Sequence, residues 1–180
     1  PRSTPLYSSA ASDVYKRQIQ AGRLRIGDSE ITVSQTVPTE ARRVGLVFQD
    51  HALFPHMTVA ENIRFGLKDG SQERINTLLA LVELTHFQDR YPHTLSGGQQ
   101  QRVAIARSLA KSPNLLLGDE LTGNLDSATS DKVMEVLVSA CEAENITTVM
   151  VTHDESLTQY ATRVIRLDSG KIISDEVVSN

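Results

Sequence analysis

Two neighbouring carboxylates, Asp119 and Glu120, end the short apolar run NLLLGDE over residues 114–120. An apolar run of this length predicts a central parallel strand. At the end of a buried strand, two adjacent carboxylates are costly unless a cation or a polar site balances them. The pair therefore predicts a catalytic or cation-binding site. The alternative is that it merely begins a surface loop.

A second candidate site lies in LSGGQQQR, residues 95–102. Ser96 can cap a helix, and Gln99, three residues on, completes a capping box. Gly97 and Gly98 then fall in the first turn, where unpaired N–H groups and the helix dipole favour an anion and glycines permit its close approach. The stretch predicts a phosphate-binding helix start. A plain serine-capped helix after a Gly-Gly loop is the alternative.

Two further polar residues follow predicted strands. Gln49 ends RRVGLVFQ, and its amide oxygen could accept from water or coordinate Mg²⁺. His153 follows TTVMVT and precedes Asp154, a candidate helix cap, so its imidazole could donate to a phosphate oxygen. Gln49 could also be a simple polar strand end, and His153 a structural residue. A His/Asp/Glu metal site is a lesser alternative, since the ligand spacing is absent.

The elements that must position these residues alternate between strand and helix. This alternation implies parallel strands joined by helical crossovers, hence an α/β fold with ligands at the strand C-termini. The residues from 58 to about 110 are predicted to be mostly helical. The other predicted elements are a hairpin (RLRI and EITV around Gly27-Asp28), strands at 42–49, 114–120 and 147–154, a helix at 127–144, and a hairpin around 168–170.

Composition narrows the function classes. The 180 residues suit one domain, and the net charge of -4 with eight aromatic residues and no Trp argues against nucleic acid as a partner. The single cysteine, Cys141, excludes an internal disulfide and a multi-cysteine metal site. No apolar run approaches the roughly 18 residues that span a bilayer, and no signal peptide is recognised. Residues 1–18 show no period, and SSAASDVYKRQ resembles translated adapter sequence, so we expect the native frame to begin near Ile19.

The octamer LSGGQQQR resembles the signature motif of ATP-binding cassette (ABC) ATPases. Other motifs follow in the order of that family: VFQ resembles the Q-loop, LLLGDE the Walker B strand with its glutamate, GNLD the D-loop and VTHD the switch histidine. The resemblance covers roughly residues 19–174. It implies a P-loop NTPase (RecA-like) core with a mainly parallel sheet, and an inserted helical subdomain at about 58–110 that carries the signature motif.

The resemblance also implies ATP and Mg²⁺ as cofactors. Asp119 would organise Mg²⁺ through water and Gln49 would coordinate it, while Glu120 would orient the attacking water and His153 would contact the γ-phosphate. The second half of the site would come from another subunit in a head-to-tail dimer. Its residues would be Ser96, Gly97, Gly98 and Gln99, with Asp126 of the D-loop at the dimer contact or acting as a helix cap, or both.

Membrane-spanning permease subunits are the other implied partner, with the chain cytoplasmic on the inner face of the plasma membrane. Residues 50–66 would supply much of the docking surface, with Leu53, Phe54 and Met57 as exposed apolar candidates. Local packing of this loop is the alternative. The stretch VFQDHALFPHMTVAENIRFGL resembles importers of iron and similar solutes, whereas TGNLD and VTHDES resemble the lipoprotein-release and macrolide-export branch.

The sequence departs from the family in three places. It contains no G-x-x-x-x-G-K-[ST] loop, so we expect that loop, with its strand and helix, upstream of the first hairpin and missing by truncation. Leu121 replaces the usual Pro and Gly118 a larger apolar residue, which predicts extra freedom beside the carboxylates. We expect the 180-residue chain to bind ATP poorly and not to hydrolyse it. An inactive fragment and a soluble ABC ATPase of chromosome maintenance or translation are the alternatives.

Overall fold

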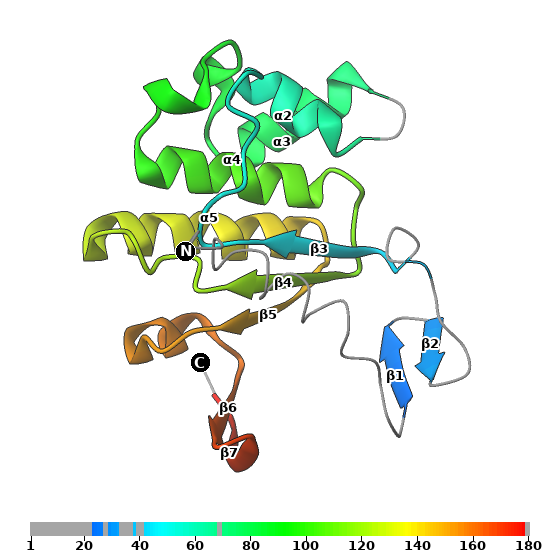
Figure 1. The fold of residues 1–180 in the computed structure, drawn as a ribbon, viewed down its shortest axis with the longest axis vertical. Helices are drawn as coiled ribbons and strands as arrows, with labels where there is room; N and C mark the ends of the chain where they lie inside the picture. The colour runs from blue at the N-terminus through cyan, green and yellow to red at the C-terminus, as the bar shows by residue number, and fades with distance from the viewer. Residues whose placement is uncertain (1–22, 27–28, 33–37, 39–41, 68–69, 179–180) are drawn as a thin grey trace, which may run out of the picture. The chain divides into compact units, whose positions relative to one another are not determined.

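The computed structural model of the chain describes residues 23–26, 29–32, 38, 42–67 and 70–178 (Figure 1). The chain divides into two compact units, residues 1–42 and residues 43–180. The predicted leader at residues 1–18 and the junction near Ile19 lie outside the described residues.

The first unit contains an antiparallel strand pair. β1 (Arg23–Ile26) pairs with β2 (Ser29–Thr32), with Arg23 opposite Thr32 and Ile26 opposite Ser29. This confirms the predicted hairpin, although its second strand begins one residue earlier than the EITV segment. The predicted turn at 27–28 lies outside the described residues.

The second unit is built on a parallel sheet with the order β3 (Val44–Val47), β4 (Leu115–Asp119) and β5 (Thr147–Val151). The register places Val47 beside Gly118, and Gly118 beside Met150. The three strands therefore end at one level, with β4 in the centre. The α/β class and the parallel pairing expected from the sequence are confirmed, and each strand is shorter than the segment predicted for it.

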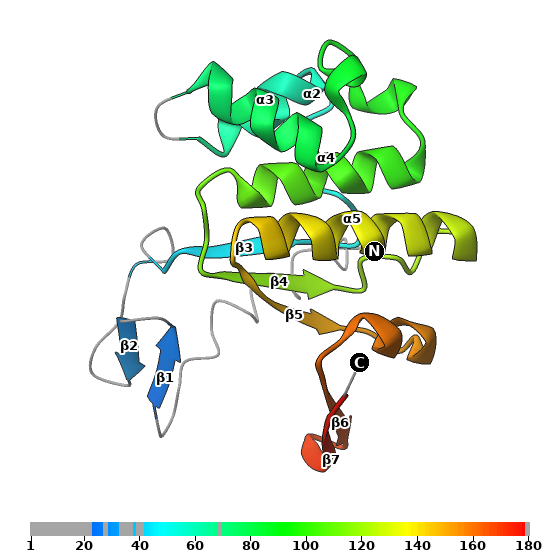
Figure 2. The same cartoon turned by 180° about the vertical axis from the view of Figure 1, so that it is seen from behind.

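Helices fill the connections between these strands (Figures 1 and 2). They are α2 (Val59–Phe65), α3 (Gln72–Leu81), α4 (Gly97–Leu109) and α5 (Ser127–Ala143), with short 3-10 helices at Thr85–Phe87, Pro92–Thr94 and Glu155–Tyr160. α4 packs against α2, α5 and β3, so it joins the helical insertion to the sheet. None of the helices in the described ranges is long and apolar enough to cross a membrane.

The core lies between these helices and one face of the sheet. Alternate residues of β3 and β4, such as Val47 and Leu116, are buried. The apolar runs predicted buried strands, and this is wrong for the other face, where Leu46, Val149 and Val151 are 46%, 49% and 63% exposed. Among the described residues, helices cover one face of the sheet alone. β3 and β4 therefore bury only every second residue, and no residue of β5 is buried.

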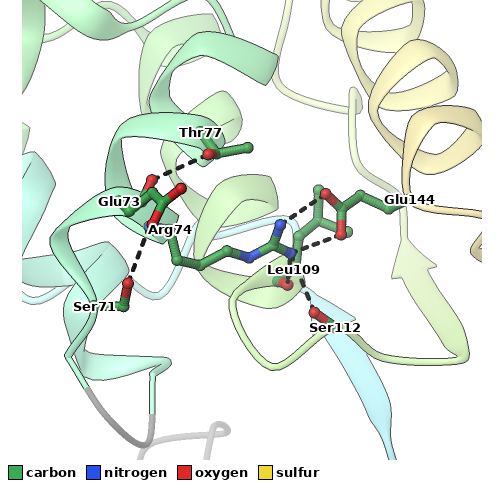
Figure 3. A network of polar contacts seen from close by, with 7 residues as sticks. All are labelled: Ser71, Glu73, Arg74, Thr77, Leu109, Ser112 and Glu144. Atoms are coloured by element: carbon green, nitrogen blue, oxygen red, sulfur yellow. Dashed lines mark hydrogen bonds and ion pairs between the residues drawn. The ribbon is translucent and has the colours of Figure 1, made fainter.

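An arginine ties the helical insertion to the far end of α5 (Figure 3). Arg74 of α3 donates to both carboxylate oxygens of Glu144, each at 2.7 Å, and to the carbonyl oxygen of Leu109 at 3.1 Å. These hydrogen bonds hold the pKa of Glu144 below its usual range. The bidentate geometry fixes α3 against the C-terminal ends of both α4 and α5.

The last elements form the predicted C-terminal hairpin. β6 (Arg163–Asp168) pairs antiparallel with β7 (Lys171–Val177), with a register shift between Arg166 and Leu167. The turn between them places Ser169 and Gly170 at φ values of 47° and 77°. Gly170 is suited to this left-handed conformation because it carries no Cβ.

Candidate functional site

The carboxylate pair lies where β4 ends. Asp119 is the last residue of the strand and is exposed, and Glu120 follows with φ 46°. The Glu120 amide donates to the Val151 carbonyl at 2.9 Å, and the Gly123 amide donates to the Glu120 carbonyl at 3.2 Å. A left-handed residue with a Cβ is unfavourable, and these two bonds stabilise it. The direction of the Glu120 side chain is therefore set by its backbone.

His153 contacts Glu120. The His153 Nδ1 atom lies 2.8 Å from Glu120 Oε1, with 77% of the imidazole and 36% of the carboxylate side chain exposed. The sequence predicted His153 beside a phosphate, and the structure places its ring against the carboxylate. Asp154 caps the following 3-10 helix by accepting from the Ser156 amide at 2.9 Å, which confirms the predicted cap and fixes the chain after His153.

Gln49 and Glu120 converge on Gly123. A Cβ placed on Gly123 would lie 3.0 Å from Gln49 Nε2 and 3.6 Å from Glu120 Oε2. A side chain at residue 123 would therefore intrude between the amide and the carboxylate. The sequence analysis did not single out Gly123, and the signal that could have found it is a glycine three residues after a carboxylate that ends a strand.

A cavity of about 400 Å³ opens beside this group. Its walls come from the turn after β4, the start of α5 and the segment after β5. The lining includes Glu120, Gly123, Ser127, Thr152 and His153. The cavity therefore lies at the carboxyl end of the parallel sheet, where α/β folds bind their ligands.

The donor set suits Mg²⁺ held jointly with water and a phosphate, but it does not suit a metal held by protein alone. Asp119 offers a carboxylate and Gln49 an amide oxygen from neighbouring strand ends, and Mg²⁺ commonly takes one or two carboxylates and keeps several waters. Within the described ranges, no three His, Cys, Asp or Glu side chains are grouped so as to hold a metal ion. The alternative of a His/Asp/Glu metal site gains no support.

The capping box at the start of α4 is confirmed. The Gln99 amide donates to Ser96 Oγ at 3.3 Å, and the Ser96 amide donates to Gln99 Oε1 at 2.9 Å. Ser96 and Gly97 are exposed, whereas Gly98 is buried. A Cβ on Gly98 would lie 2.4 Å from Thr129 Cγ2 of α5, so this glycine permits close packing of two helices. That role differs from the ligand approach predicted for it.

The start of α4 and the Glu120 group line separate cavities. The second cavity, of about 290 Å³, is lined by Ser96, Gly98, Gln99 and residues of α5, and none of its lining residues belongs to the first. Within one chain, the structure therefore does not bring the predicted phosphate-binding helix start together with Glu120 and His153.

Asp126 caps α5. Its Oδ1 atom accepts from the Thr129 amide at 3.0 Å, and the Thr129 hydroxyl donates to Oδ2 at 2.7 Å. These bonds lower the pKa of Asp126. The capping alternative is confirmed, and contact with a second subunit stays a prediction.

The proposed docking segment is more closely packed than expected. Leu53, Phe54 and Met57 are each only partly exposed, because the buried Asn62 donates to the Phe54 and Met57 carbonyls at 3.2 and 3.1 Å and accepts from the Phe54 amide. These bonds hold the loop against α2. The apolar side chain that protrudes is Phe65, which is 62% exposed and packs its ring 4.5 Å from that of Phe54.

The two departures beside the carboxylates compensate each other. Leu121 is 2% exposed, and a Cβ on Gly118 would lie 2.8 Å from Leu121 Cδ1. The leucine therefore occupies the space that a larger residue at 118 would need. The loss of packing expected from the sequence is absent at this pair.

The polar groups suited to phosphate chemistry gather at the carboxyl edge of a parallel sheet, and solved structures of similar fold are nucleotide-binding cassettes. A dimeric post-hydrolysis structure of the ATP-binding cassette MJ0796 with ADP and Pi superposes with a TM-score of 0.73 at 31% identity, covering 98% of this chain and 83% of that chain. The fold is that of a P-loop NTPase.

The chain belongs to the ABC transporter family, whose model matches residues 10–123. It is 43% identical over 163 residues to the putrescine transport ATP-binding protein PotG of Escherichia coli, covering 87% of this chain and 42% of that protein. It is 47% identical over 146 residues to the Fe(3+) ions import ATP-binding protein FbpC 2 of Pectobacterium atrosepticum, covering 76% and 41%.

An exporter is also similar. The macrolide export ATP-binding/permease protein MacB of Syntrophobacter fumaroxidans is 43% identical over 151 residues, which cover 79% of this chain and 21% of that protein. The chain thus spans about two fifths of the length of PotG and FbpC 2 and about one fifth of the length of MacB.

Proposed function

We propose that the chain is part of the ATP-hydrolysing subunit of an ABC transporter, in which ATP hydrolysis drives solute transport. The observation that carries the proposal is Glu120, fixed in a left-handed turn at the end of β4 with His153 Nδ1 2.8 Å from its carboxylate. Such a carboxylate can accept a proton from an attacking water, and the histidine beside it can hold the carboxylate in position.

The other residues act around Glu120. The Gln49 amide, which like the Glu120 carboxylate lies next to Gly123, can orient the same water. Asp119 and the Gln49 oxygen would hold Mg²⁺, which when bound neutralises negative charge on the phosphates. Glu120 is the general base because its backbone fixes it toward the cavity, whereas Asp119 is exposed at the strand end.

The second half of the site would come from another ATPase subunit. In one chain, Ser96, Gly98 and Gln99 line a different cavity from Glu120, so they would contact the nucleotide of this site only when it is bound by another subunit. The dimeric structure of the MJ0796 cassette supports the pairing of two subunits, which we propose to be head-to-tail. ATP would then bind between two chains, with Asp126 at their contact.

We further propose that the intact protein is cytoplasmic, lies on the inner face of the plasma membrane and docks on membrane-spanning permease subunits. Import of iron or a similar small solute is the favoured transport activity, since relatives named as import proteins for sulfate/thiosulfate, Fe(3+) and molybdenum match the chain. A relative named for putrescine transport matches as well. Export is the second candidate activity, because a relative named as a macrolide export protein also matches the chain.

The test is ATP hydrolysis by the intact gene product, meaning this chain with a G-x-x-x-x-G-K-[ST] segment. We expect Glu120→Gln to lower kcat by about 10²-fold or more while ATP still binds, because it removes the base alone. Glu135→Gln is the matched control, since Glu135 is exposed on α5 and pairs only with Lys132 at 3.9 Å. Undiminished turnover by the Glu120 variant would refute the role of Glu120.

The same preparation tests the transport assignment. ATP hydrolysis should rise when the subunit is reconstituted with its permease and the transported solute, and Fe(3+) is the first solute to assay. The 180-residue chain should show no turnover, because its sequence contains no G-x-x-x-x-G-K-[ST] loop.

A further inference from the structure

The chain leaves β3 through two consecutive residues in a strained conformation. His51 and Ala52, just after Gln49, have φ values of 58° and 48°. Both carry a Cβ; histidine is one of the residues found in the left-handed region more often, whereas alanine is unfavourable there. Two such residues in succession persist only where surrounding contacts stabilise them.

One side chain supplies those contacts. Arg107 of α4 donates from Nη1 to the Ala52 carbonyl at 2.6 Å and from Nη2 to the His51 carbonyl at 3.2 Å. Its guanidinium also lies 5.6 Å from the centre of the Phe54 ring. The two strained residues are therefore the two whose carbonyl oxygens the guanidinium binds.

Among the described residues, the guanidinium of Arg107 donates hydrogen bonds to the carbonyl oxygens of this loop and forms no ion pair. No ion pair joins Arg107 to a carboxylate among the described residues, whereas Arg102 on the same helix pairs with Glu83 at 3.4 Å. A guanidinium that is partly buried without a carboxylate partner needs backbone carbonyls to replace water. The sequence analysis gave Arg107 no role, because its acceptors lie 55 and 56 residues away along the chain.

We propose that Arg107 is a positioning residue for Gln49. By fixing His51 and Ala52 against α4, it sets the direction in which the chain leaves β3, and so keeps the Gln49 amide beside Glu120. The same helix begins at Ser96, about 16 Å away along its axis at 1.5 Å per residue. The catalytic part of the proposal, in which Gln49 takes part in hydrolysis, rests on the proposed function. The structural part, in which Arg107 fixes the loop, does not.

The structural test uses the 180-residue chain and amide hydrogen exchange. Arg107→Met keeps most of the apolar stem and removes the donors. We expect the amides of His51 and Phe54, both hydrogen-bonded, to exchange about tenfold faster or more, the change that follows from losing one charge-assisted hydrogen bond. Arg102→Met is the matched control, and it should leave these two amides unchanged.

Rescue by Ala52→Gly separates positioning from general support of α4. Glycine has no penalty for φ 48°, so Ala52→Gly should restore slow exchange in the Arg107→Met background. A merely structural arginine would not be rescued by a residue that relieves strain in the loop. Unchanged exchange in Arg107→Met, or failure of Ala52→Gly to restore it, would overturn the proposal.

The catalytic test uses the intact, hydrolysing protein. Arg107→Met should lower kcat several-fold with the KM for ATP within about twofold, and Ala52→Gly should recover the loss. If exchange responds as expected but kcat does not follow it, Arg107 does not position a reacting Gln49 and the proposal is wrong. A wild-type protein that does not hydrolyse ATP would instead show that the proposed function itself has failed.

Discussion

Replacing Gln101 with Met should stabilise the chain, whereas the same change at the neighbouring Gln100 should destabilise it. Gln101 of α4 is fully buried, and neither its Nε2 nor its Oε1 atom has a hydrogen-bond partner in the described part of the chain. Gln100 is partly exposed, and its Nε2 atom donates to the carbonyl oxygens of Pro92 and Leu95 at 3.1 and 3.2 Å. The two side chains are identical, so the comparison isolates their surroundings.

The contacts set the size of each effect. A buried polar group without a partner costs about 1–3 kcal/mol, and a volume-conserving apolar replacement costs below about 1.5 kcal/mol. Gln101→Met should therefore raise the free energy of unfolding by about 1–2 kcal/mol. Gln100→Met loses two hydrogen bonds worth about 0.5–1.5 kcal/mol each and should lower it by about 1–2 kcal/mol. The two variants should differ by about 3 kcal/mol.

Urea unfolding followed by circular dichroism measures both variants against the wild type. The slope of the free energy of unfolding against urea concentration should be the same in all three proteins, so that a shift in the midpoint reports a change in stability. If Gln101→Met is destabilised as much as Gln100→Met, the Gln101 amide has a partner and the reasoning from its burial is refuted.

Three further outcomes are expected. Gly98→Ala should destabilise the chain by about 1–3 kcal/mol in urea unfolding, because its Cβ would meet Thr129 Cγ2 at 2.4 Å, and Thr129→Ser should recover most of the loss; no recovery would contradict this contact. Hydrogen bonds from Arg74 lower the pKa of Glu144 in the folded chain. The stabilisation from this pair is therefore present above the unfolded pKa of about 4.3 and is lost as the pH falls through the folded pKa. The free energies of unfolding of wild type and Glu144→Gln, measured against pH, should converge in acid. Burial raises the pKa of the Cys141 thiol, so labelling with a disulfide reagent should be slow until urea unfolds the chain, and fast labelling of native protein would argue against its burial.

The parts of the fold that depend on local sequence could be predicted. The capping box at Ser96 joins residues three apart, and it forms as expected. The alternation of apolar strands with helices predicted the parallel sheet, which the structure confirms. These features depend on residues that are close together in the sequence and on the small number of ways in which α/β folds connect their strands.

The remaining features depend on contacts between distant residues. The hydrogen bond from Arg107 to the His51 carbonyl and the close packing of Gly98 against Thr129 correspond to no periodic pattern in the sequence. The exposure of Leu46, Val149 and Val151 was also missed, because their apolar runs are typical of parallel strands that are buried on both faces. The pairing of His153 with Glu120 depends on two turns whose geometry no motif specifies.

The level ends of β3, β4 and β5 limit how this chain can change in length during evolution. Side chains alternate between the two faces of a strand, so deleting one residue from β4 would turn Leu116 away from the helices and move Glu120 into the place of Asp119. The proposed catalytic carboxylate would be lost without any substitution at Glu120. Insertions and deletions compatible with activity should therefore collect in the C-terminal hairpin, where a register shift at Arg166 is already accommodated.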